Sequence, residues 1–246
     1  MKIVVVGATS AIAEHCCRLW VAHGPVELIL LVRDLAKAEP IAANLRARGP
    51  SSTVAVVKAD FHDPAATAAQ VDAVAASGPV DLALIAQGWL ADQSLCQQDL
   101  AMLRESLEIN AVSPTLFAEA FAAQFARQGR GTLGIIGSVA GDRGRKANYS
   151  YGAAKGLLAR YAEGLQHRFA GSAVRVVLIK PGPTVSPMTA ARSVRGIRVA
   201  PTEDVARTIV AGLARGKAVV YAPPVWRLIM LVVRHLPRVI FNRTSI

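Results

Sequence analysis

The chain has 246 residues, of which 52% are hydrophobic and 18% charged, so it is long enough for one globular domain and too apolar to be disordered or fibrous. Its 28 basic and 17 acidic residues give a net charge of +11, which favours an anionic partner. Three cysteines are too few and too irregularly spaced for a disulfide framework or a thiolate site, and we expect no bound metal.

The start of the chain, MKIVVVG, is too short for the core of a signal peptide, and no apolar run approaches the roughly 20 residues of a membrane span. We therefore expect a cytoplasmic protein. No zinc-finger spacing or aromatic RNA-binding motif occurs, so we expect no nucleic-acid partner.

Short apolar, β-branched runs alternate with amphipathic stretches along the chain, which predicts strands separated by helices. Strands that are apolar almost throughout indicate a parallel sheet covered on both faces. We therefore predict a single-domain α/β fold over residues 1–222, a Rossmann-like doubly wound sheet with its ligand at the carboxyl ends of the strands. The predicted strands are 2–7, 26–32, 52–58, 80–86, 131–137, 174–180 and 217–222, and the predicted helices are 10–23, 35–48, 63–77, 97–109, 112–128, 150–170 and 202–214.

Residues that favour the start of a helix occur at the beginning of two of the predicted helices. Asp63 and Pro64 are a cap and a first-turn proline, and Thr202 opens the last predicted helix with acidic residues behind it. Residues 183–201 lack periodicity, and we expect a mobile loop there.

The turn after the first strand, GATSAIAE, predicts a dinucleotide site, because a strand-to-helix turn offers backbone N–H groups and a positive helix end to a pyrophosphate. Only one glycine of the usual motif is present, so an ordinary tight turn is the alternative. Gly7 would form the turn and two hydroxyls would face the ligand. The candidate residues are Gly7, Thr9, Ser10, Ala11 and Ile12.

The second strand ends in LLVRD, where an arginine suits the 2′-phosphate of NADP and an acidic residue suits the ribose hydroxyl of NAD. Arg33 therefore favours NADP(H), while Asp34 leaves NAD(H) open. After the third strand, Asp60 and its neighbour Phe61 are candidates for the adenine site, with Asp60 accepting from the adenine amino group. A loop aspartate is the alternative.

The stretch YSYGAAK places Tyr151 and Lys155 four residues apart, on one face of a helix, and turns Tyr149 elsewhere. We expect the ammonium to lower the pKa of the Tyr151 phenol, which suits a general acid or base. A structural pair on a solvated helix face is the alternative. Ser138, at the end of the fifth strand, can hydrogen-bond a substrate carbonyl that Tyr151 protonates.

Together with Asn110 in EINAVSP, IAQG after the fourth strand and KPGPTVSPM after the sixth, these residues resemble the short-chain dehydrogenase/reductase family from residue 1 to about 222. The resemblance implies that Tyr151 is the catalytic acid, that Lys155 lowers its pKa and binds the nicotinamide ribose, and that Asn110 holds a water. It also implies a homo-oligomer. Ala86 and Gly88 would line the adenosine and ribose, and Pro181, Gly182, Thr184 and Ser186 would flank the nicotinamide and phosphates.

Two alanines depart from the family pattern. Ala11 and Ala13 stand where the family usually has glycine. A left-handed alanine would cost about 1–2 kcal/mol, which would weaken cofactor binding.

The catalytic segment and the tail, residues 223–246, resemble the decaprenylphosphoryl-2-keto-erythro-pentose reductase type within the family, which implies a keto-sugar on a polyprenyl phosphate. The tail's short apolar run lies between arginines and suits a helix at a membrane surface, which we expect to be the inner face of the membrane. Packing on the protein's own body or on a second subunit is the alternative. Arg143, Arg145, Lys146, Arg192, Arg195 and Arg198 are further bases that can bind a phosphate or an anionic membrane, or can be solvated.

The leading hypothesis is a carbonyl reductase that acts on a small or lipid-linked anionic substrate. A reductase of 3-oxoacyl groups on an acidic carrier protein is the second hypothesis. A non-catalytic cofactor sensor or membrane-surface module is the third.

Overall fold

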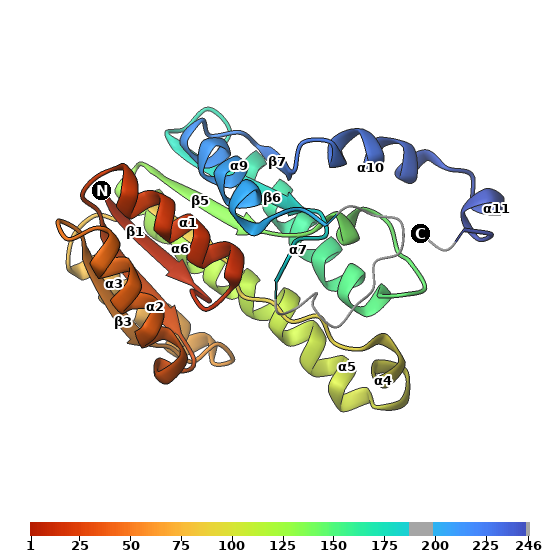
Figure 1. Ribbon diagram of the computed structural model, residues 1–246, viewed down its shortest axis with the longest axis horizontal. Coiled ribbons are helices and arrows are strands. Elements are labelled where there is room, and N and C mark those ends of the chain that lie inside the picture. The colour runs from red at the N-terminus through yellow and green to blue at the C-terminus, as the bar shows by residue number, and fades with distance from the viewer. Residues whose placement is uncertain (187–198, 245–246) are drawn as a thin grey trace.

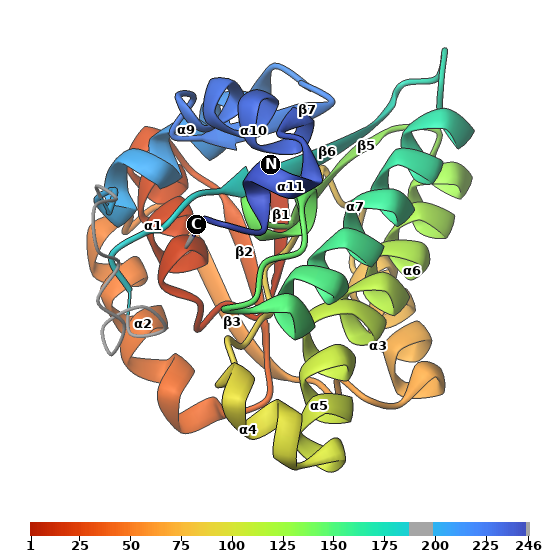
Figure 2. The ribbon, with the colours of Figure 1, turned by 90° about the vertical axis from the view of Figure 1, so that its right-hand side faces the viewer.

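A parallel sheet in the strand order β3-β2-β1-β4-β5-β6-β7 forms the centre of the molecule (Figures 1 and 2). The computed structural model describes residues 1–186 and 199–244. The order reverses between β1 and β4, and a doubly wound sheet binds its ligand at such a reversal. The strands are β1 (Lys2–Val6), β2 (Glu27–Val32), β3 (Thr53–Lys58), β4 (Leu82–Ile85), β5 (Gly131–Ile136), β6 (Val174–Pro181) and β7 (Val219–Ala222). The predicted fold class and strands are confirmed.

Helices cover both faces of the sheet, and a separate apolar core lies between the helices and the sheet on each face. One core lies under α1, α2 and α9, and the other lies under α3, α6 and α7. Burying both faces explains why the strands are apolar at nearly every position. The bounds are α1 (Ala11–His23), α2 (Leu35–Arg48), α9 (Thr202–Ala214), α3 (Pro64–Ala76), α6 (Ser113–Gln128) and α7 (Tyr149–Arg168).

The predicted start of α3 is confirmed in its details. The Asp63 carboxylate accepts hydrogen bonds from the backbone N–H groups of Ala65, at 3.0 Å, and Ala66, at 3.3 Å. Pro64 occupies the first helical position, where its missing N–H costs no helical hydrogen bond.

The helix predicted over 97–109 is wrong in its bounds. The structure has α4 (Gln93–Gln98) and α5 (Leu100–Leu107), which meet at Asp99. Asp99 accepts hydrogen bonds from Ala101 N and Met102 N, so a capping side chain starts a new helix inside the predicted one. A π-helical turn, η1 (Glu108–Val112), then joins α5 to α6 where we expected a break. Such turns are frequent at functional sites.

The tail after β7 forms two helices, α10 (Trp226–His235) and α11 (Arg238–Phe241). Figure 2 shows both helices on the side of the sheet where the carboxyl ends of the strands lie. α10 packs against a 3₁₀ turn, η2 (Val139–Asp142), which follows β5. Within residues 1–186 and 199–244, no helix has the length and apolar character needed to cross a membrane.

Candidate active site

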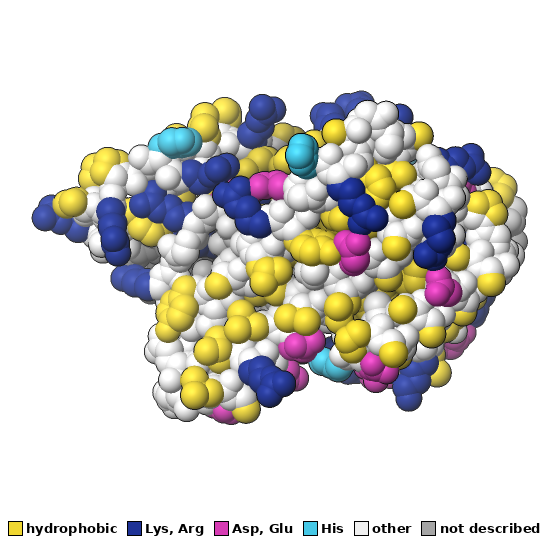
Figure 3. Space-filling model, turned by 180° about the vertical axis from the view of Figure 1, so that it is seen from behind, with side chains coloured by type: hydrophobic (Ala, Val, Ile, Leu, Met, Phe, Trp, Pro, Cys, Tyr) yellow, Lys and Arg dark blue, Asp and Glu magenta, His cyan; other side chains and the backbone are white. Residues whose placement is uncertain are grey.

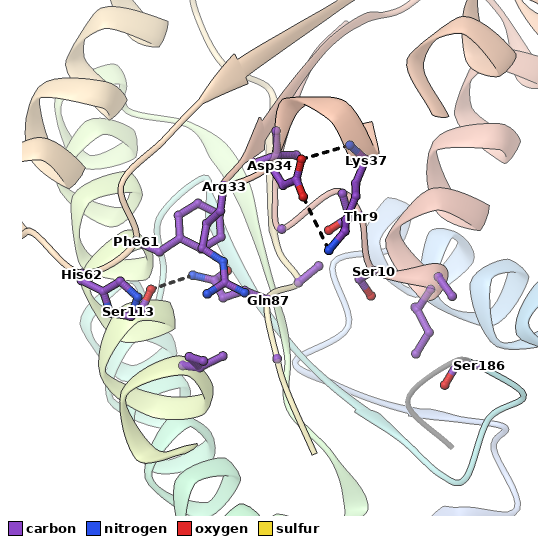
Figure 4. A pocket seen from close by; sticks show the side chains of 17 residues that line it. Thr9, Ser10, Arg33, Asp34, Lys37, Phe61, His62, Gln87, Ser113 and Ser186 are labelled. Atoms are coloured by element: carbon purple, nitrogen blue, oxygen red, sulfur yellow. Dashed lines mark hydrogen bonds and ion pairs between the residues drawn. The ribbon is translucent and has the colours of Figure 1, made fainter. Parts of the chain in front are cut away.

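A cavity of about 340 Å³ lies at the carboxyl ends of β1, β2 and β4, where the strand order reverses (Figure 4). Its walls come from the β1–α1 turn, the ends of β2 and β4, and the loop after β3. The predicted cofactor residues that line it are Gly7, Thr9, Ser10, Ala11, Ile12, Arg33, Phe61, Ala86, Gly88 and Ser186. Ten of the predicted cofactor residues therefore lie around one cavity.

Gly7 makes the tight turn at the base of this cavity. Its φ is +76°, in the left-handed region that favours glycine, and its N–H donates to Leu31 O at 2.9 Å. A Cβ at this position would lie 2.7 Å from Gln87 N. Both the backbone conformation and the close approach of the β4 loop therefore require glycine here.

Ala11 and Ala13 carry none of the strain expected from the sequence. Among the described residues, only glycines have positive φ. Ala11 is the first residue of α1, and Ala13 is buried in the core beneath it. The expected cost of a left-handed alanine is therefore wrong.

The start of α1 fits an anionic ligand. No side chain caps its first turn, whereas Asp34 caps α2 and Asp63 caps α3. The first N–H groups of a helix need partners from outside it, and the positive end of the helix dipole attracts negative charge.

The cavity wall also contains a buried acceptor without a partner. Gln87 is 7% exposed, and its Nε2 donates to Ser113 Oγ at 3.3 Å. Its Oε1 has no hydrogen-bond partner among the described residues. Leaving such an atom unpaired costs about 1–3 kcal/mol, so a ligand that donates to it would be stabilised. A nicotinamide dinucleotide fits this wall.

The corner at the end of β2 holds three charges that line the cavity. Asp34 accepts from Lys37 N at 3.2 Å and pairs with Lys37 Nζ at 3.5 Å, as Figure 4 shows. These contacts lower the pKa of the Asp34 carboxyl, the bond from Lys37 N being the largest cause. The Arg33 guanidinium lies 5.9 Å from the Phe61 ring centroid and has no acidic partner among the described residues. Asp34 is thus already engaged, and Arg33 remains available to an anion.

Six predicted cofactor residues do not line this cavity: Tyr151 and Lys155, described below, and four others. Asp60 Oδ1 accepts from His62 N at 2.8 Å and from Asp63 N at 3.4 Å, so its carboxylate organises the loop before α3. Thr184 donates to Gly182 O at 2.9 Å and is buried. Gly182 packs against Trp226 of α10, and Pro181 is buried at the end of β6.

Tyr151 and Lys155 lie together on α7, as the spacing predicts. Lys155 Nζ is 5.8 Å from the Tyr151 ring centroid, and it donates to Ile136 O at 3.1 Å. Lys155 is 2% exposed, whereas Tyr149 is 45% exposed. The lysine is therefore a buried cation, not part of a solvated helix face.

Gly88 connects this pair to the cavity. A Cβ at Gly88 would lie 3.3 Å from Asn110 Oδ1 and 3.6 Å from Lys155 Nζ. Because Gly88 also lines the cavity, the lysine and the asparagine stand directly behind its wall. The structure thus places three of the predicted residues, Gly88, Asn110 and Lys155, next to one another.

The turn η2 holds Ser138 close to α7. Ser138 Oγ accepts from Ala140 N at 3.1 Å and caps η2. A Cβ at Gly141 of η2 would lie 2.7 Å from the Lys155 backbone, so only glycine allows η2 to approach α7 this closely.

The chain matches the family model described as "short chain dehydrogenase" over residues 1–195. It belongs to the short-chain dehydrogenase family of oxidoreductases. It is 34% identical over 245 residues to an uncharacterised oxidoreductase of Streptomyces coelicolor, with 98% of this chain and 95% of the relative covered. An uncharacterised oxidoreductase of Mycobacterium tuberculosis is 33% identical over 242 residues, with 98% and 96% covered. A solved short-chain dehydrogenase from Sphingobium yanoikuyae, in complex with NADPH, has a TM-score of 0.81 at 22% identity and covers 96% of each chain.

The pKa of Tyr151 in this short-chain dehydrogenase shifts the opposite way from our expectation. Burial raises the pKa of the Tyr151 phenol, while the Ser138 hydroxyl and the positive charge of Arg145 lower it. Burial also lowers the pKa of Lys155 to about 8. Both shifts arise because a low-dielectric environment disfavours the charged form, which helical spacing alone does not reveal.

Asn110 has a different set of partners from the water that the resemblance implies. Its Nδ2 donates to Trp89 O at 2.6 Å and to Ser106 O at 2.8 Å, and its Oδ1 accepts from Trp89 N at 2.9 Å. Asn110 is fully buried within η1. In this short-chain dehydrogenase its side chain fixes the loop after β4, and the water-binding role stays a prediction.

A buried network missed by the sequence analysis holds the far end of η2. Asp142 Oδ1 pairs with Lys180 Nζ at 2.5 Å, and Asp142 Oδ2 accepts from the Tyr221 hydroxyl at 2.8 Å. The Asp142 and Lys180 side chains are 2% and 7% exposed. Burial and the Asp142 carboxylate raise the pKa of Tyr221 to about 12. The sequence shows charged residues near the ends of strands. It does not show which of them form pairs, because the partners are far apart along the chain.

The further basic residues named in the sequence analysis lie in different environments. Arg143 is used to hold the tail, because it donates to Val233 O and to Leu236 O. Arg145 is half-buried, and burial lowers its pKa while the Tyr151 phenolate raises it. Lys146 is exposed. Arg192, Arg195 and Arg198 lie outside the described residues.

Proposed function

We propose that this short-chain dehydrogenase uses NADPH to reduce a ketone to an alcohol. The observation that carries the proposal is the convergence of Lys155 and Asn110 behind Gly88, at the wall of a cavity that fits a dinucleotide. When bound, the reduced nicotinamide supplies the hydride.

The roles of the side chains follow from their environments. A raised pKa keeps the Tyr151 phenol protonated near neutral pH, so it can donate its proton to the carbonyl oxygen. The Ser138 hydroxyl would donate a second hydrogen bond to the same oxygen, where negative charge develops. Lys155, with a pKa of about 8, is charged below that pH and favours the phenolate that remains after proton transfer.

The choice of NADPH rests on the corner at the end of β2. Arg33 has no acidic partner there within the described residues, whereas both oxygens of Asp34 contact Lys37. An arginine in this position accommodates a 2′-phosphate. The S. yanoikuyae relative in complex with NADPH supports the same choice.

The substrate class is inferred from charge. Arg145 is half-buried near Tyr151 and has no carboxylate partner among the described residues. A guanidinium in that position binds a phosphate or carboxylate of the substrate. With the net charge of +11, it favours an anionic substrate. We propose a keto-sugar on a polyprenyl phosphate, reduced by a cytoplasmic enzyme that associates peripherally with the membrane and forms a homo-oligomer.

A turnover panel tests the proposal. The full chain is assayed with NADPH or NADH against a neutral bulky ketone, a prenyl-phosphate keto-pentose and a 3-oxoacyl carrier-protein thioester. We expect NADPH to be preferred and the prenyl-phosphate substrate to have the highest kcat/KM. Higher turnover of the carrier-protein thioester would replace the proposed substrate, and no turnover of any ketone would contradict the reductase itself.

Paired arginine and lysine variants test the anionic substrate. Arg145→Met should raise KM for the prenyl-phosphate substrate by about tenfold or more, because a charge-assisted hydrogen bond is lost. The KM for the neutral ketone should stay near that of the unmodified protein. Lys146→Met, at the exposed neighbouring position, is the matched control. Equal effects on both substrates would place Arg145 in a structural role.

A further inference from the structure

The tail has apolar side chains on two sides, and only one side packs on the body. Trp226, Met230 and Val233 are each buried and form a small cluster with Val139 of η2. A Cβ at Gly182 would collide with the Trp226 indole, so the first turn of α10 lies directly on the loop after β6.

Arg143 fixes the orientation of the tail. Its Nη1 donates to Val233 O and, at 2.8 Å, to Leu236 O, which are carbonyls at the carboxyl end of α10. Its guanidinium carbon lies 3.8 Å from the Phe241 ring centroid of α11. One side chain thus ties both tail helices to the turn beyond Ser138. The opposite side of the tail is therefore held in a fixed direction.

That opposite side is apolar and exposed, and we call it the outer face. In α10, Leu228 is 66% exposed, Leu231 57% and Val232 62%. A gathering of large apolar side chains on the surface indicates an interaction site. The outer face comprises the exposed apolar side chains of the tail, which are Val225, Leu228, Ile229, Leu231, Val232, Val239 and Ile240.

The charges around the outer face have one sign. Residues 223–244 contain four arginines and no aspartate or glutamate. Figure 3 shows basic and apolar side chains intermixed at the end of the molecule that carries α10 and α11. The arginines, all exposed, are Arg227, Arg234, Arg238 and Arg243.

We propose that the outer face docks on the surface of an anionic lipid bilayer. Its apolar side chains would enter the boundary between headgroups and acyl chains while the arginines bind the lipid phosphates. A second copy of the chain is a poorer occupant, because a two-fold interface would bring two basic tails together. α10 has 10 residues. At about 1.5 Å per residue it is much shorter than the roughly 30 Å core of a bilayer, so it would lie along the surface.

Docking would place the catalytic group next to the membrane. α10 packs on η2, which begins immediately after Ser138. A ketone carried on a lipid would then reach Ser138 and Tyr151 from the bilayer. In this respect the inference rests on the lipid-linked substrate proposed above, but the docking itself requires only the tail.

Vesicle sedimentation of the full chain tests the docking. We expect binding to vesicles of phosphatidylcholine with phosphatidylglycerol, weaker binding at high salt, and little binding to phosphatidylcholine alone. The double variant Leu231→Asp with Val232→Asp should reduce partitioning by about tenfold or more. Leu100→Asp on α5, at a position 76% exposed, is the matched control and should bind as the unmodified protein does.

Charge reversal tests the basic component separately. Arg227→Glu with Arg238→Glu should reduce vesicle binding by about tenfold or more, while Arg130→Glu, also exposed and outside the tail, should not. NADPH binding and thermal unfolding of each variant show that the fold is kept.

Three results would overturn the docking proposal. They are equal binding to neutral and anionic vesicles, no vesicle binding at all, or a change from dimer to monomer in the double variant with unchanged vesicle binding. Turnover of a soluble ketone by the same samples reports on the proposed function independently. Lost vesicle binding with intact turnover, or the reverse, therefore separates the two proposals.

Discussion

At the carboxyl ends of β1, β2 and β4 the chain leaves a cavity, whereas at the ends of β5, β6 and β7 it packs side chains against one another. The cavity is built from a glycine turn, an uncapped helix start and small residues. The packed side depends on the buried Asp142–Lys180 pair and on a tryptophan from the tail. The difference teaches that the cavity is preformed by local backbone structure, while the packed side is shaped by contacts between distant parts of the chain.

Breaking the buried ion pair should have the largest effect on stability. Asp142→Asn leaves the Lys180 ammonium buried without a counter-charge, which should lower the free energy of unfolding by about 3–5 kcal/mol. Denaturant unfolding measures this loss. The double variant with Lys180→Met should recover much of it, since no uncompensated charge remains. An unchanged free energy of unfolding in Asp142→Asn would show that η2 is held by other contacts.

A substitution in the glycine turn should damage the cofactor side alone. Gly7→Ala adds a Cβ 2.7 Å from Gln87 N at a φ of +76°. The left-handed strain alone is about 1–2 kcal/mol, and we expect NADPH binding to weaken by about 100-fold. Isothermal titration measures the affinity.

Gly129→Ala is the matched control for this turn. Its φ of +74° is similar, but a Cβ there meets nothing within 4 Å. It should destabilise the protein modestly and leave NADPH affinity unchanged. Equal loss of affinity in both variants would mean that the loss in Gly7→Ala does not depend on the place of Gly7 in the cavity wall.

Removing the buried lysine should have a smaller effect on the free energy of unfolding, and this effect should depend on pH. The pKa of Lys155 is about 8 in the folded protein and about 10.4 in an unfolded chain. Between these values the unfolded chain binds more protons, so stability contributed by this group rises with pH. Below pH 8 the buried charge is unfavourable. Lys155→Met should therefore raise the free energy of unfolding at neutral pH by about 1–2 kcal/mol while abolishing catalysis.

Unfolding curves across the same pH range check the sign. The difference between Lys155→Met and the unmodified protein should shrink as the pH rises from 8 to about 10. Lys146→Met, on the exposed loop, should follow the unmodified protein. A difference that grows with pH would contradict the burial of a charged lysine.

The sequence predicts the parts of this molecule that depend on neighbours along the chain. The alternation of strands and helices, the cap at Asp63 and the shared face of Tyr151 and Lys155 all follow from patterns of a few residues. The direction of the Tyr151 pKa shift does not, because it depends on how much protein surrounds the phenol.

Contacts between residues far apart in the sequence explain the features that the sequence does not predict. Asp142 is separated from Lys180 by 38 positions and from Tyr221 by 79, so no local pattern connects them. The tail illustrates a second limit. Its sequence indicates an amphipathic helix, but only the packing of Trp226 and Met230 on η2 distinguishes the buried side from the outer face.

The two tyrosines of YSYGAAK provide the most direct test of the account. In single-turnover experiments with bound NADPH and a ketone, Tyr151→Phe should slow cofactor oxidation by about 100-fold or more, because the proton donor is lost. Tyr149→Phe, at an exposed position, should change the rate by no more than about twofold. NADPH affinity should be similar in all three proteins. A Tyr151→Phe variant that oxidises NADPH as fast as the unmodified protein would contradict the central claim.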